Sequence, residues 1–120
     1  MNAKQALLSV LDAMGLPYWI MHEMPHEIDY PPKFCTYMTT DAPFVDFHDN
    51  APRAVAWAFM IGFYSNAPGN IDSDVVRLVI ELRKAGFVVH GLGEDVQSDE
   101  PTHIGRRLTL AKLEQFEMEE

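Results

Sequence analysis

The most constraining feature of this 120-residue sequence is a run, residues 54–64, that is apolar on both faces of an extended chain. Successive side chains of a β-strand point to opposite faces of the sheet. One face would carry the larger residues Val55, Trp57, Phe59, Ile61 and Phe63. The other face is smaller but still largely apolar. Such a strand has to be covered on both sides, by a helix and a second sheet or by a neighbouring subunit.

Two segments have the pattern of amphipathic helices. Residues 3–14 place their apolar side chains on one stripe, with Asn2 as the expected N-cap and Gly15 as the expected left-handed residue beyond the end. Residues 75–84 follow acids, end in bases and precede Gly86. Acids near the start and bases near the end stabilise the helix dipole, so this segment predicts a second helix.

The remaining segments alternate between strand-forming and turn-forming composition. β-Branched and aromatic residues, or polar–apolar alternation, predict strands over residues 18–21, 34–40, 87–90 and 103–113. Prolines and acids predict irregular connections over residues 23–32, a loop or hairpin connection over 42–52, a turn over 65–70, an acidic loop over 91–102 and a frayed acidic tail over 115–120.

The predicted order is therefore α-β-β-β-α-β-β, in a single domain over residues 1–120. This order predicts an α+β fold, in which a mixed or antiparallel sheet of about four to five strands carries two helices packed on one face.

Composition limits the possible partners. The formal charge is −9, from 18 acids against 9 lysines and arginines, which argues against general affinity for the nucleic-acid backbone. The single cysteine, Cys35, excludes an internal disulfide and is expected to be a small buried apolar residue. No secretory signal and no membrane-length apolar run are visible, so we expect a soluble protein without a membrane partner.

One motif suggests a metal site, but the sequence around it does not favour the helix that such a site requires. Residues 22–26 spell H-E-x-x-H, the signature in which a helix directs His22 and His26 toward zinc. Pro25 lies inside the required helical turn, where it removes a hydrogen bond and clashes with the preceding backbone. The other histidines, His48, His90 and His103, have no second ligand at a suitable spacing. We therefore expect no enzyme, no catalytic residue, no metal site and no cofactor.

The charged residues near the C-terminus form the candidate interaction surface. Glu94, Asp95, Asp99 and Glu100 do not have the spacing of a Ca²⁺ loop and are expected to be solvated. Arg106 and Arg107 follow each other in a predicted strand and should therefore point to opposite faces. We expect each arginine to serve an interface or an intramolecular salt bridge.

Three stretches resemble one family: the strand ending at residues 63–66, the helix of residues 71–85 running into residues 87–89, and residues 93–103. Together with an N-terminal helix that enters a strand at Leu16-Pro17, they are similar to the small tail-completion or tail-terminator proteins of long-tailed bacteriophages. The similarity covers most of the chain in element order, and no single motif is diagnostic.

The resemblance implies a structural virion protein of the phage neck, made in the host cytoplasm. Such proteins cap the tail tube as a ring, often a hexamer, and dock it to head-completion proteins. An acidic lumen would let DNA pass without specific binding, because like charges repel. Two alternatives remain: a head–tail adaptor or other neck component, and a small-ligand or regulatory module whose aromatic residues Trp19, Tyr37, Trp57 and Phe59 line a pocket.

Overall fold

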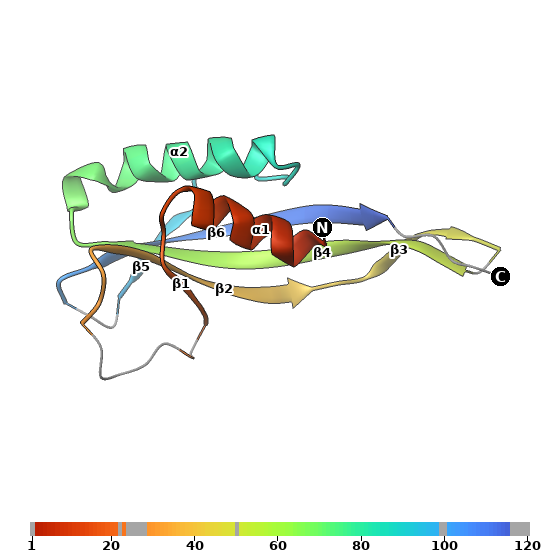
Figure 1. Cartoon of the computed structure of the whole chain (residues 1–120), viewed down its shortest axis with the longest axis horizontal. Coiled ribbons are helices and arrows are strands. Elements are labelled where there is room, and N and C mark those ends of the chain that lie inside the picture. Colours follow the sequence, from red (N-terminus) through yellow and green to blue (C-terminus); the bar gives the residue numbers. More distant parts are fainter. Residues whose placement is uncertain (1, 22, 24–28, 50, 99–100, 116–120) are drawn as a thin grey trace.

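The computed structural model describes residues 2–21, 23, 29–49, 51–98 and 101–115. Two helices and a six-stranded mixed sheet form an open α+β fold (Figure 1). The class is the one that the sequence predicts, with one strand more than the four to five expected. The elements, in chain order, are α1 (Ala3–Ala13), β1 (Tyr18–Ile20), β2 (Lys33–Asp41), β3 (Phe44–His48), β4 (Ala51–Ser65), the 3-10 turn η1 (Pro68–Asn70), α2 (Ile71–Lys84), β5 (Glu94–Gln97) and β6 (Ile104–Gln115).

Strand β4 is the axis of the sheet. The strand order is β1-β2-β4-β6-β5, with β3 also paired to β4, and the β1–β2 pair alone among these is parallel. β4 is 15 residues long and pairs with β2 and β3 along one edge and with β6 along the other. Its register brings Phe59 between Thr39 and Leu110, and Ile61 between Tyr37 and Leu108.

The sheet extends well beyond the helices. The β3–β4 hairpin projects past the helical layer (Figure 1), and we call residues 41–53 the arm. The described chain measures 53 × 29 × 23 Å, with a radius of gyration of 15.9 Å. A compact chain of this length would have a radius of gyration of about 14 Å. The larger radius of gyration reflects the arm, which extends away from the core.

Local signals account for both helices. Asn2 accepts a hydrogen bond from the backbone N–H of Gln5, whose side chain accepts one from the Asn2 backbone, so α1 begins with a capping box. Gly15 and Gly86 follow the two helices with φ of 70° and 95°, a left-handed conformation that glycine adopts without steric cost. α2 carries acids in its first turn and bases in its last, as the sequence predicts.

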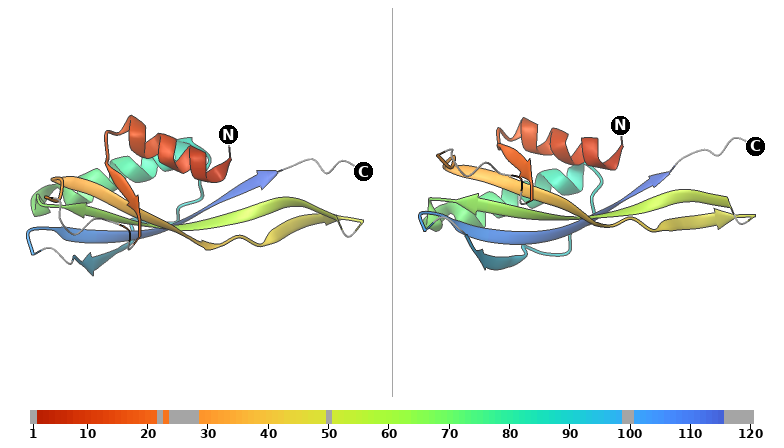
Figure 2. Two further views of the ribbon diagram at one scale, coloured as in Figure 1. Left: turned by 60° about the horizontal axis from the view of Figure 1, so that its bottom comes forward. Right: turned by 90° about the horizontal axis from the view of Figure 1, so that it is seen from below.

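The main hydrophobic core lies on one side of the sheet. Both helices cover the same face (Figure 2), and the buried side chains of this core come from that face and from the helices. Burying each large apolar side chain stabilises the fold by about 1.5–3 kcal/mol. The largest of them are Leu7, Leu11, Phe59, Ile61, Phe63, Leu78, Leu82 and Leu108.

Three predicted boundaries are wrong, each for a local reason. Residues 42–52 are more than a connection, because β3 pairs with the start of β4, which begins at Ala51 rather than at residue 54. Residues 87–90 are not a strand: Phe87 and Val89 are buried, and only Val88 forms a bridge, with Ala111. Residues 91–102 contain β5, whose acids pair with β6 across the sheet edge.

Cys35 gives the first test of this packing. Its thiol is fully buried, as predicted, and burial raises its pKa to about 12 from the ordinary 9.0. Above pH 9 the unfolded chain therefore releases the thiol proton while the folded chain keeps it. This difference lowers the free energy of unfolding by up to about 1.4 kcal/mol per pH unit between these two pKa values.

We expect urea midpoints between pH 8 and 11 to fall more steeply for the native protein than for Cys35→Ala. The variant starts from lower stability because it lacks the buried sulfur atom, so the slope with pH is the quantity to compare. Parallel slopes would show that this thiol ionises at its ordinary pH in the folded state.

Candidate functional site

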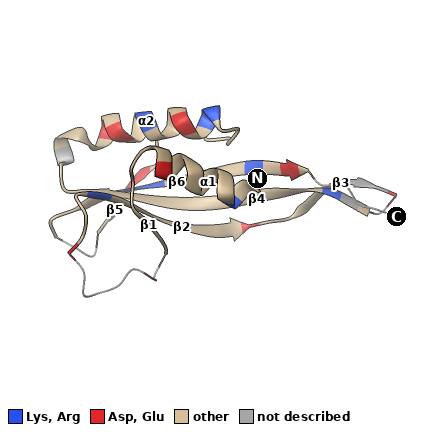
Figure 3. Cartoon of the chain, in the orientation of Figure 1, with Lys and Arg blue, Asp and Glu red and all other residues tan. Residues whose placement is uncertain are grey.

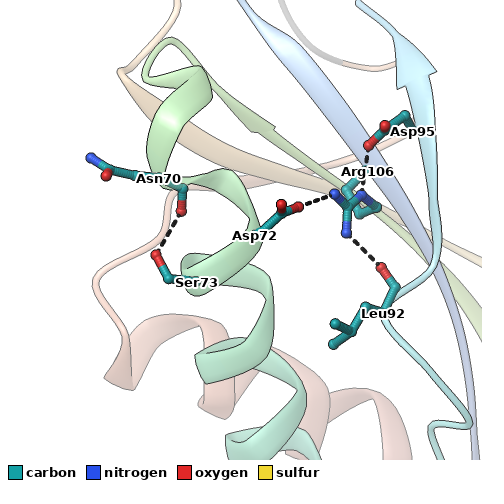
Figure 4. A network of polar contacts seen from close by, with 6 residues as sticks. All are labelled: Asn70, Asp72, Ser73, Leu92, Asp95 and Arg106. Atoms are coloured by element: carbon teal, nitrogen blue, oxygen red, sulfur yellow. Dashed lines mark hydrogen bonds and ion pairs between the residues drawn. The ribbon is translucent and has the colours of Figure 1, made fainter.

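Arg106 joins three elements on the helical side of the sheet. Its side chain is 10% exposed and donates hydrogen bonds to Asp72 at the start of α2, to Asp95 of β5 at 2.8 Å and to the carbonyl oxygen of Leu92 at 3.0 Å (Figure 4). The hydrogen bond to Asp72 raises the pKa of Arg106, so the guanidinium stays charged. Beside it, the hydroxyl of Ser73 donates to the carbonyl oxygen of Asn70 at 3.0 Å, in the first turn of α2.

Arg107 points to the opposite face and pairs with Glu94 of β5. Both side chains are partly exposed, so solvent screens this pair more than the contacts of Arg106. Of the two roles expected for these arginines, the structure contains intramolecular salt bridges. Glu94 and Asp95 are thus paired rather than merely solvated, while Asp99 and Glu100 lie outside the described residues. Acidic residues lie on both helices as well as on the strands (Figure 3).

No sequence signal identified Asp72 as the partner of Arg106, because 34 residues separate them and α2 has to pack before they meet. The β5–β6 pairing had a weak signal. Glu94 and Val96 lie on one face of β5 and Asp95 on the other, and the arginines alternate in the same way on β6. Two adjacent arginines opposite two adjacent acids are typical of cross-strand ion pairs.

The face of the sheet opposite the helices, which we call the open face, is apolar in its middle. Cross-strand register places Met38, Met60 and Thr109 in one row, with Ala58, Ala111 and Val88 in the next, which ends at Asp41 of β2. Ala56 and Leu113 follow toward the arm. Val88 and Leu113 are each 52% exposed, and no described element covers these rows. β4 is apolar on both faces, as expected, but within the described part of the chain a helical layer covers only one of them and no second sheet lies over the other.

Aromatic side chains close the other end of the open face. Phe34 stacks on Tyr64 with ring centroids 5.1 Å apart and also contacts Trp19, Tyr30 and His103 edge-on. The Tyr64 ring passes close over Gly62 and Gly105, where a Cβ atom would lie within 3 Å of it. His103 is buried and its Nε2 lies 2.8 Å from the carbonyl oxygen of Pro31, which can only accept, so Nε2 carries the proton.

The four aromatic residues considered for a ligand pocket do not converge. Tyr37 and Phe59 are buried in the core under the helices, and Trp57 stacks on Phe59. Trp19 lies on the other face against Phe34. Three of them therefore pack in or against the core and Trp19 packs on the other face, so the four do not surround a shared cavity.

The chemical motifs leave no site among the described residues. No group of three or more potential ligands of a metal ion occurs there. Of the H-E-x-x-H segment, residues 22 and 24–26 lie outside the part of the chain that the structure describes, as do residues 116–120 of the predicted frayed tail. Neither α1 nor α2 has the length and apolar character that crossing a bilayer requires.

No protein family matches this sequence, and no curated protein matches it with significance. The surfaces described above are therefore the basis for any functional proposal.

The two arginines allow a matched test of which ion pair holds the fold. Arg106→Met keeps most of the aliphatic stem but loses three hydrogen bonds, two of them to carboxylates. We expect it to lower the free energy of unfolding by about 1–3 kcal/mol. Arg107→Met removes the exposed pair with Glu94 and should cost about 0–1 kcal/mol. Urea titrations followed by Trp19 and Trp57 fluorescence give both values, and equal losses would contradict a special role for Arg106.

Proposed function

We propose that this chain is a structural virion protein that caps the end of a phage tail tube as a ring and docks it to the head-completion proteins of the neck. Its partners are other copies of itself in a ring, a hexamer by analogy with the family, together with the tail-tube protein and a head-completion protein. The protein acts through its surfaces and carries out no reaction. DNA passes through the ring without specific binding.

The open face is the observation that carries this proposal. In an antiparallel sheet that faces water, the outward positions are normally polar, so that the strands alternate between apolar and polar side chains. Here Ala56, Ala58 and Met60 occupy outward positions of the central strand, beside Leu113 of β6. An exposed apolar surface that is built into regular structure is typical of protein–protein contact sites. We assign it to contact with the tail tube.

The charge distribution supports the passage of DNA rather than its binding. The chain is acidic overall, and two of its nine bases, Arg106 and Arg107, are engaged by acids of β5. A ring built from such subunits would repel a polyanion in its channel if Glu94, Asp95, Asp99 and Glu100 lined it.

A head–tail adaptor would use the same surfaces in another layer of the neck, and tube binding separates the two functions. A ligand-binding module remains the alternative of another class. It would stay monomeric and gain thermal stability with its ligand.

The first experiment measures the mass of the protein by light scattering, alone and with purified tail tubes, followed by electron microscopy of the mixture. We expect a ring, or density confined to one end of the tubes. A protein that remains monomeric and leaves the tubes undecorated would refute the proposal.

Two single substitutions then test the open face. Leu113→Asp places a charge within the proposed contact and should reduce tube decoration at least tenfold, because it leaves a desolvated charge without a partner. Ile20→Asp is the matched control, since Ile20 is 47% exposed on the short edge strand β1 and away from these rows. Both variants should keep the far-ultraviolet circular dichroism of the native protein. Equal loss in both would show that the open face is not the contact.

A further inference from the structure

A groove runs between the two helices on the outer side of the helical layer. It has a volume of about 840 Å³. Ala6 and Val10 of α1, Met14 just beyond its end and Ile80 of α2 give it an apolar lining, and Ile80 remains 46% exposed. Arg77, Lys84 and Glu81 are the charged residues that line the groove, and Lys84 pairs with Glu81 at 3.2 Å, so Arg77 gives the groove its net positive charge. Arg77 makes no ion pair among the described residues.

The arm carries the complementary features. Phe44 is 57% exposed, the highest value among the large apolar side chains of the described chain. Residues 41–53 contain three aspartates, Asp41, Asp46 and Asp49, and one arginine, Arg53, which gives a formal charge of −2. An aromatic side chain on an acidic hairpin matches a concave apolar groove with basic residues along it.

The charge of the helical layer makes this match selective. Asp72 and Asp74 are engaged by Arg106 and Lys33 from the sheet. The remaining charged residues of α1 and α2 are four bases and two acids, a formal charge of +2 in a chain of −9. They are Lys4, Asp12, Arg77, Glu81, Arg83 and Lys84. An acidic segment is therefore attracted to this layer and repelled by most of the chain.

The arm cannot fill the groove of its own chain. β4 runs without interruption from beneath the helices to the arm, so the hairpin points away from the helical layer (Figures 1 and 2). At about 3.3 Å per residue, its 15 residues keep the arm far from the groove. The occupant must come from another molecule.

We propose that the arm of one copy inserts Phe44 into the interhelical groove of a second copy, against Val10, Met14 and Ile80. The two surfaces are different parts of the chain, so the contact is heterologous: each copy gives an arm to one neighbour and receives one from another. Repeated contacts of this kind close into a ring when the rotation between copies permits. The inference rests on the proposed function insofar as the ring is the functional form, and it specifies how that ring is joined.

Disulfide trapping tests the contact directly. Phe44→Cys and Ile80→Cys are made as separate variants, one of them with a mass tag, then mixed with and without tail tubes and oxidised. The tagged heterodimer should form at least tenfold faster than in a mixture of Phe44→Cys with Leu113→Cys. Leu113 is the matched control because it is similarly exposed but lies on the open face. Native Cys35 stays silent, since its thiol is fully buried.

A second variant keeps the test independent of cysteine geometry. Phe44→Ala should weaken self-association about 30-fold, the effect expected for a central aromatic contact, without changing the circular dichroism of the monomer. Ile20→Ala serves as its control.

The outcomes separate this inference from the proposed function. Rings or tube caps that form without the Phe44–Ile80 cross-link, or that persist at full strength in Phe44→Ala, overturn the inference and leave the proposed function standing. Cross-linking of Ile80→Cys to a tube subunit instead of the arm also overturns it. A specific Phe44–Ile80 cross-link in a protein that ignores tubes supports the inference and overturns the tail-terminator function. If neither the cross-link nor any assembly forms, both the inference and the proposed function are overturned.

Discussion

The pairing of β4 along both of its edges is the constraint on which the rest of the structure depends. Its 15 residues hydrogen-bond to β2 and β3 on one side and to β6 on the other, so segments from both ends of the chain are held in one register. A shift of one residue would move Phe59, Ile61 and Phe63 from beneath the helices to the open face. The buried side chains of α1 and α2 fix that register, because they need these three residues opposite them.

Arg106 adds a polar lock to this apolar arrangement. It lies next to the core on the same face as Phe63 and connects β6 to β5 and to the start of α2. Its partners keep much of their exposure, so they remain solvated while the guanidinium gives up water. Such an arrangement avoids much of the desolvation cost of a fully buried ion pair and still selects one orientation of the helix.

The sequence contained the parts of the fold that depend on local patterns. Caps and stripes located α1 and α2, and two-sided apolarity located β4. β3 was missed because prolines at 43 and 52 and the acids between them have the composition of a loop, while pairing with β4 holds the segment extended. The strand expected at residues 87–90 failed for the converse reason. Its composition favours a strand, but burial of Phe87 and Val89 leaves one bridge, at Val88, along β6.

The candidate surfaces could be predicted from the sequence only in part, because they too depend on tertiary structure. The second apolar face of β4 followed from alternation, but its extent required the register that brings Ala111, Leu113 and Val88 beside it. The groove could not be foreseen, because it arises where two helices meet whose facing residues are far apart in sequence. The charge pairing of Glu94 and Asp95 likewise needed β5 to form.

The choice of residues on the open face is itself informative. Alanine is depleted in strands, because it offers little side chain to pack against its neighbours. Ala56, Ala58 and Ala111 nevertheless occupy adjacent outward positions at the centre of the sheet. Threonine or valine would favour the strand more at each of them. Small side chains lower the strand propensity but leave a flat surface, which another backbone or sheet can approach closely. A surface that faces only solvent does not need to be flat. The alanines with low strand propensity lie where the arm meets the core. β4 therefore both holds the fold together and presents the apolar surface to which we assign a partner.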